Sequence, residues 1–343
     1  MNRFPLLFTF LAAFGLIWLS GCGEKDKIKP SKQMEITIQN EFTSLPAKVS
    51  IFFKVDYKNG NPVADLTEED FVIFEKGRND NEAREISEFE AERRISDNSQ
   101  IFAHSTVLLL DLSESVTETS LTELKEAAIS FVEEVIPDTS SGFDVGVWWF
   151  DGSDQLHQLV PFTKDKNVLV AGINTLSATL SQDNSTDLYG AVVKGTEIAR
   201  QFQEINVQKN IISASSVVIF TDGRDQAGRY EKKEALDAIK DAPEDLTFFT
   251  IGLGGEIDKK VLEDIGKDGT AFASDRDELI ERFKEIGCLV SAQANSYYLF
   301  EYCSPKRNGS GTNELTIAVS NGKSAGSITT EFDATGFEGG CTL

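Results

Sequence analysis

Hydrophobic and polar residues follow two different patterns along this chain. In the middle, short continuous apolar runs alternate with segments whose apolar residues recur every three or four positions. The runs are typical of strands buried on both faces, and the recurring pattern is typical of amphipathic helices. The clearest runs are Val107–Leu110, Val145–Phe150, Val217–Phe220 and Leu246–Ile251. This alternation predicts a doubly wound α/β sheet with helices on both faces.

The two flanks differ from the middle, because apolar and polar residues alternate there with a period of two. Residues 34–101 contain such a stretch at Val49–Val55. Residues 289–343 also carry β signals, and we expect strands at Tyr297–Cys303, Glu314–Val319 and Ser327–Phe332. Three strands make a thin domain by themselves. We therefore expect both flanks to build one smaller, all-β, sandwich-like domain, with the α/β domain (102–288) inserted in it.

The first 21 residues form a predicted lipoprotein signal peptide. A short basic start precedes the apolar run Phe4–Leu19, which is short for a membrane span. The run ends in Leu19-Ser20-Gly21-Cys22, which resembles a bacterial lipobox and implies cleavage before Cys22 and lipidation of that cysteine. Residues 22–33 would then be a lipidated tether in the bacterial cell envelope, and Gly23 favours the outer membrane. The alternative is an uncleaved anchor helix.

Oxygen-bearing side chains follow the ends of two buried runs and precede one helix. Asp111, Ser113 and Ser115 follow the first run, Asp222 follows Val217–Phe220, and Thr186 precedes an amphipathic helix. Open α/β sheets keep their ligand sites at the carboxyl ends of strands, so these side chains are expected to meet there. Oxygen ligands are those that Mg²⁺ prefers.

The pattern Asp-x-Ser-x-Ser, followed by a distant Thr and a distant Asp, resembles the metal-ion-dependent adhesion site of the von Willebrand factor type A (vWA) domain family. The resemblance implies a Mg²⁺ ion, with Ca²⁺ or Mn²⁺ as alternatives. It also implies direct ligation by the three hydroxyls and ligation through water by the two carboxylates. The implied metal ligands are Asp111, Ser113, Ser115, Thr186 and Asp222.

Each of these residues also has an ordinary structural explanation. Asp111 and Ser113 could cap the next helix, and Thr186 could cap its own. Asp222 and the glycine after it could form a common turn. The occurrence of all five in the family's order favours the metal site. Five further aspartates fall on or near loops at the same edge, with solvated turn residues as their alternative explanation: Asp151, Asp154, Asp183, Asp187 and Asp225.

Charge and composition narrow the function further. The chain has 56 acidic and 33 basic residues, a net charge of −23, which argues against a nucleic-acid partner. Its two histidines match no metal or catalytic motif, so a metal-dependent hydrolase is the weakest hypothesis. The leading one is a non-enzymatic module that binds a protein partner through an acidic residue of that partner. The alternative is a scaffold or assembly lipoprotein whose metal mainly stabilises the fold.

Export implies an oxidising compartment, in which cysteines form disulfides. Besides Cys22 the chain contains three cysteines, so one disulfide and one free thiol is the simplest interpretation. We expect the pair Cys303–Cys341, because both residues lie in the β-rich C-terminal part. Cys288 is then expected as a small apolar residue at a helix end, although a Cys288–Cys341 pair stays open.

Overall fold

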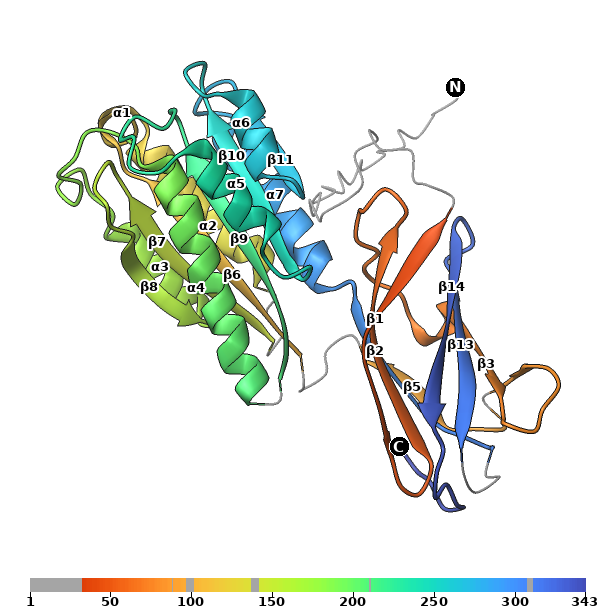
Figure 1. Ribbon diagram of the computed structural model, residues 1–343. Helices are drawn as coiled ribbons and strands as arrows, with labels where there is room; N and C mark the ends of the chain where they lie inside the picture. The colour runs from red at the N-terminus through yellow and green to blue at the C-terminus, as the bar shows by residue number, and fades with distance from the viewer. Residues whose placement is uncertain (1–32, 88, 97–101, 137–141, 210, 307–310) are drawn as a thin grey trace, which may run out of the picture.

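The computed structural model describes residues 33–87, 89–96, 102–136, 142–209, 211–306 and 311–343. In Figure 1 an α/β domain with one six-stranded sheet adjoins a β-domain with two four-stranded sheets. The predicted fold class is therefore confirmed.

The central sheet of the α/β domain has five parallel strands and one antiparallel edge strand, β8. Their spatial order is β11 (Gly269–Ala273), β10 (Leu246–Leu253), β9 (Ile212–Thr221), β6 (Phe102–Asp111), β7 (Phe143–Phe150) and β8 (His157–Thr163). Because parallel strands end at the same edge of a sheet, the loops that follow β6, β7 and β9 are neighbours there.

Helices cover both faces of this sheet (Figure 1). One face packs against α2, α3 and α7, and the other packs against α4, α5 and α6. A short helix, α1, follows β6 directly. The helices are α1 (Glu114–Thr119), α2 (Leu121–Val135), α3 (Lys166–Asn174), α4 (Leu188–Gln208), α5 (Lys232–Lys240), α6 (Lys259–Ile265) and α7 (Leu279–Ala294).

Strand β6 is buried on both of its faces, as the apolar run predicted. Leu108 and Leu110 lie in the cluster under α2 and α7, whereas Val107 and Leu109 lie in the cluster under α4. Burying one such side chain stabilises a fold by about 1.5–3 kcal/mol. The strand is therefore held on both sides up to its last residue, Asp111.

The β-domain is built from strands of both flanks of the chain. One sheet has the order β1 (Met34–Ser44), β2 (Lys48–Tyr57), β12 (Tyr297–Cys303), β5 (Arg93–Ser96). The other has the order β14 (Ala325–Asp333), β13 (Thr312–Ser320), β3 (Phe71–Lys76), β4 (Arg84–Glu85), and a 3₁₀ turn at Glu68–Asp70 precedes β3. Because β12 lies between β2 and β5, and β13 pairs with β3, the α/β domain is an insertion in a sandwich-like domain, as predicted.

The predicted domain boundaries and the lipoprotein segment stay predictions. The boundary between residues 288 and 289 falls within α7, and the signal peptide, Cys22 and most of the tether lie outside the described residues. Within the described part of the chain, no helix is both long and apolar enough to span a lipid bilayer.

The cysteine prediction was right in one part and wrong in another. A disulfide joins Cys303 to Cys341, which ties the end of the chain to β12. Cys288, however, lies in the interior of α7, is half-buried, and is disulfide-bonded; no described cysteine is a free thiol. The sequence pattern placed the end of this helix too early, because the apolar stripe of α7 continues through Val290 to Ala294.

Candidate metal centre

The three predicted metal loops meet at the carboxyl edge of the central sheet. Four of the five predicted ligands, Ser113, Ser115, Thr186 and Asp222, line one cavity of about 480 Å³. The fifth, Asp111, is fully buried at the end of β6. Residues that are up to 111 positions apart in the sequence are thus brought together by the order of β6 and β9 in the sheet.

Hydrogen bonds connect four of the five residues, three of them through their side chains and Asp111 through the backbone amide of Ser113. Ser115 Oγ donates to Asp222 Oδ1 at 2.8 Å, and the Ser113 and Ser115 hydroxyls are 3.4 Å apart. Asp111 accepts from the Ser113 amide at 2.8 Å and from Thr221 Oγ1 at 2.6 Å. In the described part of the chain, no hydrogen bond joins the Thr186 hydroxyl to the other four side chains.

The capping explanations for Ser113 and Thr186 are wrong. Ser113 does occupy the N-cap position of α1, but its side chain makes no capping hydrogen bond. The N-cap of α4 is Asp187, whose carboxylate accepts from the Gly190 amide at 3.2 Å, and Thr186 lies one residue before it. Neither hydroxyl is therefore used to cap a helix.

The carboxylates of Asp111 and Asp222 both have raised pKa values. Burial raises the pKa of Asp111 to about 7, although the Thr221 hydroxyl and the Ser113 amide act against this. Burial also raises the pKa of Asp222. Among the described residues, no ion pair links either carboxylate to a lysine or arginine. A cation bound beside them would favour their charged forms.

The donor set fits a hard divalent cation. Carboxylate and hydroxyl oxygens, and no nitrogen or sulfur, come from these five side chains. The described residues contain no cluster of three or more His, Cys, Asp or Glu side chains placed to hold a metal.

The five aspartates predicted near the edge do not line the cavity. Asp151 and Asp187 are buried and hydrogen-bonded, so for these two the explanation as solvated turn residues is wrong. Asp154 is exposed and pairs with Lys194. Asp183 and Asp225 are half-buried and accept hydrogen bonds from nearby backbone amides.

Sequence reasoning missed the acidic residues that do line the cavity, together with a supporting hydroxyl. Glu114, Glu256 and Asp275 lie on its wall, beside Arg276. All four come from loops or helix starts that follow β6, β10 or β11, so the strand-end rule that located the ligands could have located them too. Thr221, which donates to Asp111, could have been suspected from its place at the end of β9.

Residues 106–285, slightly more than half of the chain, match the family model described as von Willebrand factor type A domain. Solved structures show similar chains. A von Willebrand factor type A protein from Catenulispora acidiphila is 12% identical, with a TM-score of 0.48, over 89% of this chain and 74% of that chain.

Two other similar structures are reported with metals. The manganese-loaded TRAP protein of Plasmodium vivax is 13% identical, with a TM-score of 0.44, over 71% of this chain and 98% of that chain. The proximal thread matrix protein 1 of the mussel byssus, with a zinc-occupied MIDAS motif, is 16% identical with a TM-score of 0.43. That match covers 60% of this chain and about half, 49%, of the mussel chain.

Proposed function

Because this chain belongs to the von Willebrand factor type A domain family, we propose that it is a non-enzymatic binding protein. It is exported, held in the bacterial cell envelope by a lipid on Cys22, and binds a protein partner through a divalent cation, Mg²⁺ in the first place. The observation that carries this proposal is the convergence of oxygen donors from three separate loops on one cavity, which is lined by Ser113, Ser115, Thr186 and Asp222 and has Asp111 buried behind it.

Each loop has a distinct role in this proposal. The loop after β6 presents two hydroxyls, Ser113 and Ser115, on the cavity wall, while Asp111 stays behind them as a buried negative charge. The loop after β9 adds Asp222, and the segment that precedes α4 adds Thr186. Hydroxyl ligands carry no charge, so a bound divalent cation would remain able to accept a carboxylate oxygen from the partner.

The charge of the cavity wall restricts the partner. Four carboxylates, those of Glu114, Asp222, Glu256 and Asp275, and one guanidinium, that of Arg276, give the lining three negative charges. A divalent cation leaves one of them uncompensated, before any partner carboxylate is added. We therefore propose a partner that presents one acidic residue within a neutral or basic surface, since charges interact over a Debye length of about 8 Å at physiological salt.

The test uses the mature chain and a magnesium titration by isothermal calorimetry, followed by capture of envelope proteins. We expect saturable Mg²⁺ binding and a partner that is retained in Mg²⁺, released by EDTA, and absent with Asp111→Ala. Association of that partner is expected to slow as salt concentration rises. Absence of Mg²⁺ binding, or capture that is the same with EDTA and with Asp111→Ala, would contradict the proposed function.

The burial of Asp111 favours one alternative function, a scaffold lipoprotein whose metal mainly stabilises the fold. A cation that binds only the native state raises its stability by mass action, whichever function is correct. The two functions differ in the effect of metal loss. A scaffold loses its native fold at growth temperature in EDTA, whereas a binding module keeps its fold and loses only its partner.

A further inference from the structure

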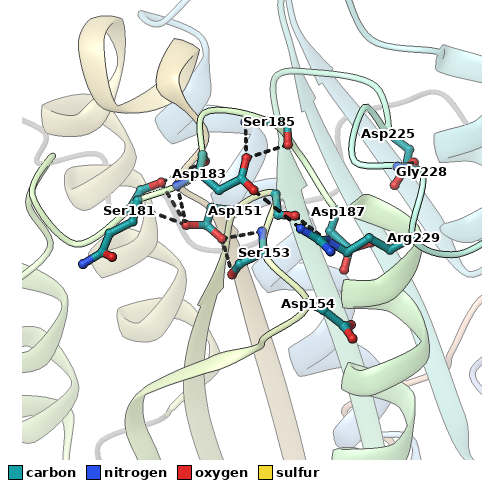
Figure 2. A network of polar contacts seen from close by, with 12 residues as sticks. Asp151, Ser153, Asp154, Ser181, Asp183, Ser185, Asp187, Asp225, Gly228 and Arg229 are labelled. Carbon is teal, nitrogen blue, oxygen red and sulfur yellow. Dashed lines mark hydrogen bonds and ion pairs between the residues drawn. The ribbon is translucent and has the colours of Figure 1, made fainter.

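A fourth loop lies at the same edge of the sheet and supplies none of the predicted ligands. It comprises residues 151–153, directly after β7, and Figure 2 shows it beside the segment 181–187 that precedes α4. We call residues 181–187 the Thr186 loop. The contacts between the 151–153 loop and the Thr186 loop are numerous, and they start from two adjacent residues.

The first of these is Asp151, whose carboxylate accepts five hydrogen bonds (Figure 2). Oδ1 accepts from the amide and the hydroxyl of Ser153, at 2.8 and 2.5 Å. Oδ2 accepts from the Ser181 hydroxyl at 3.0 Å and from the Gln182 and Asp183 amides at 3.2 and 3.3 Å. The Asp151 carbonyl also accepts from the Asp187 amide at 2.9 Å.

The second is Gly152, whose backbone leaves no room for a side chain. A Cβ atom there would lie 1.8 Å from Ser185 Oγ and 2.4 Å from Asp183 Oδ1. These two atoms also form a hydrogen bond with each other, in which the Ser185 hydroxyl donates to Asp183 Oδ1 at 2.7 Å. The Gly152 carbonyl accepts from Arg229 Nε at 2.5 Å. A side chain at residue 152 would therefore displace the Ser185 and Asp183 side chains from this contact.

Thr186 is thus held from two sides. Asp151 fixes the residues before it and the residue after it. On the other side, the Thr186 carbonyl accepts from the Gln226 and Ala227 amides, at 2.9 and 3.1 Å, in the loop that begins with Asp222. Arg229, which follows in that loop, reaches back to Gly152. The three loops form one connected set, in which the Thr186 hydroxyl itself has no hydrogen-bonded neighbour among the other predicted ligands.

From these contacts we infer that Asp151 and Gly152 are positioning residues for the metal centre: they set the place of the Thr186 hydroxyl and hence the affinity for the cation. This inference rests on the proposed function, because it assumes that Thr186 is a ligand. It assigns a role to a loop that the ligand pattern leaves out.

The experiment measures Mg²⁺ binding to the mature chain by calorimetry for wild type and Asp151→Asn. The amide of Asn can accept at one oxygen only, so the Thr186 loop loses part of its anchoring. Loss of an outer partner of a metal ligand weakens binding by about 10- to 100-fold, and we expect that range here. Gly152→Ala should weaken binding in the same range if Asp151→Asn does not fold. Asp165→Asn, at the N-cap of α3, is the matched control with unchanged affinity.

Two further readouts separate positioning from a general loss of structure. Amide hydrogen exchange should accelerate at Gln182 and Asp183 in Asp151→Asn and stay unchanged in the strands. In a Thr186→Ala background, Asp151→Asn should weaken Mg²⁺ binding no further, because the hydroxyl that it positions is gone. In a Ser115→Ala background its full effect should remain.

The outcomes distinguish this inference from the proposed function. Wild-type chain that binds no Mg²⁺ would overturn both. Wild-type binding that Asp151→Asn leaves unchanged would overturn the positioning role alone. Equal weakening by Asp151→Asn in the Thr186→Ala and Ser115→Ala backgrounds would also overturn it, since the effect would then not pass through Thr186.

Discussion

Asp111 is the last residue of β6, and Asp151 directly follows the neighbouring parallel strand β7. Both side chains are almost completely buried, yet their pKa values shift in opposite directions. Asp111 accepts hydrogen bonds from one amide and one hydroxyl, and burial raises its pKa to about 7. For Asp151, burial acts in the same direction, but the five hydrogen bonds from Ser153 and the Thr186 loop outweigh it and its pKa is lowered.

The comparison shows what burial alone does not reveal about a carboxylate. A buried carboxylate that the protein surrounds with donors is a structural anchor, and its charge is already compensated. A buried carboxylate with few donors and no cationic neighbour becomes protonated unless a cation from outside the chain compensates its charge. At this edge, the anchor Asp151 and the uncompensated Asp111 follow adjacent strands, and the anchor holds the loop of Thr186, one of the proposed ligands.

The largest expected effect is on metal binding. Asp111→Asn keeps the size of the side chain and removes its charge, so we expect Mg²⁺ affinity to fall by more than about 100-fold, beyond the range for outer partners of a ligand. Calorimetry at pH 8 measures this, with Asp165→Asn as control. The distinction between the two aspartates would be wrong if Asp111→Asn bound Mg²⁺ with wild-type affinity while Asp151→Asn bound it more weakly.

The pH dependence of stability should be the next largest effect, and it concerns Asp111 in EDTA. Its folded pKa of about 7 exceeds the unfolded value of 3.8, so between these pH values the native state binds more protons than the unfolded state. The free energy of unfolding therefore falls as pH rises through this window, by at most about 1.4 kcal/mol per pH unit.

Urea unfolding of wild type and Asp111→Asn from pH 4 to pH 8 measures this contribution as the difference between the two curves. As pH rises, the free energy of unfolding of the variant should increase relative to that of wild type. Saturating Mg²⁺ should abolish this difference in pH dependence. A difference that stays constant with pH would show that the Asp111 carboxylate is compensated within the chain.

A smaller effect of opposite sign is expected at the anchor. Asp151→Asn leaves buried donors of the Thr186 loop without an acceptor, which costs about 1–3 kcal/mol of unfolding free energy at pH 8 in EDTA. Asp111→Asn under the same conditions should stabilise the chain. If Asp151→Asn and Asp111→Asn changed the free energy of unfolding in the same direction, the distinction between an anchor and an uncompensated charge would be wrong.

The smallest effect concerns the cavity wall. Burial is the main cause of the raised pKa of Asp222, and the nearby charge of Glu256 adds to it. Glu256→Gln should therefore lower the pKa of Asp222 and weaken Mg²⁺ binding by less than about 5-fold, the size of an exposed charge interaction. Carbon-13 NMR titration follows the carboxyl group, and an Asp222 pKa that does not move would place Glu256 outside the field of the site.

Much of the fold could be predicted, because the signals that set it are local. The apolar run of β6 indicated a strand buried on both faces, and the period-two flanks indicated strands of a shared β-domain. The candidate ligands were predictable for the same reason: each stands at a strand end or before a helix, and parallel strands bring those ends together.

The roles of Asp151 and Cys288 could not be predicted, because they depend on contacts between distant segments. Three of the five donors to Asp151 come from residues about thirty positions away, and no periodicity in the sequence records that contact. Cys288 was assigned to a helix end because the apolar stripe of α7 was followed only as far as residue 286. The paths of the loops also determine which acidic residues line the cavity. Glu256 and Asp275 were not predicted for this reason.

The most direct test of the central claim is the anomalous scattering of Mn²⁺ in crystals of the mature chain soaked with that ion at pH 8. We predict one strong peak in the cavity, within reach of Ser113, Ser115 and Thr186, and no peak at the carboxylate of Asp151. A peak beside Asp151, or an empty cavity at saturating Mn²⁺, would contradict this claim. The claim is that Asp111 and its neighbours bind a cation, whereas hydrogen bonds within the chain already compensate the negative charge of Asp151.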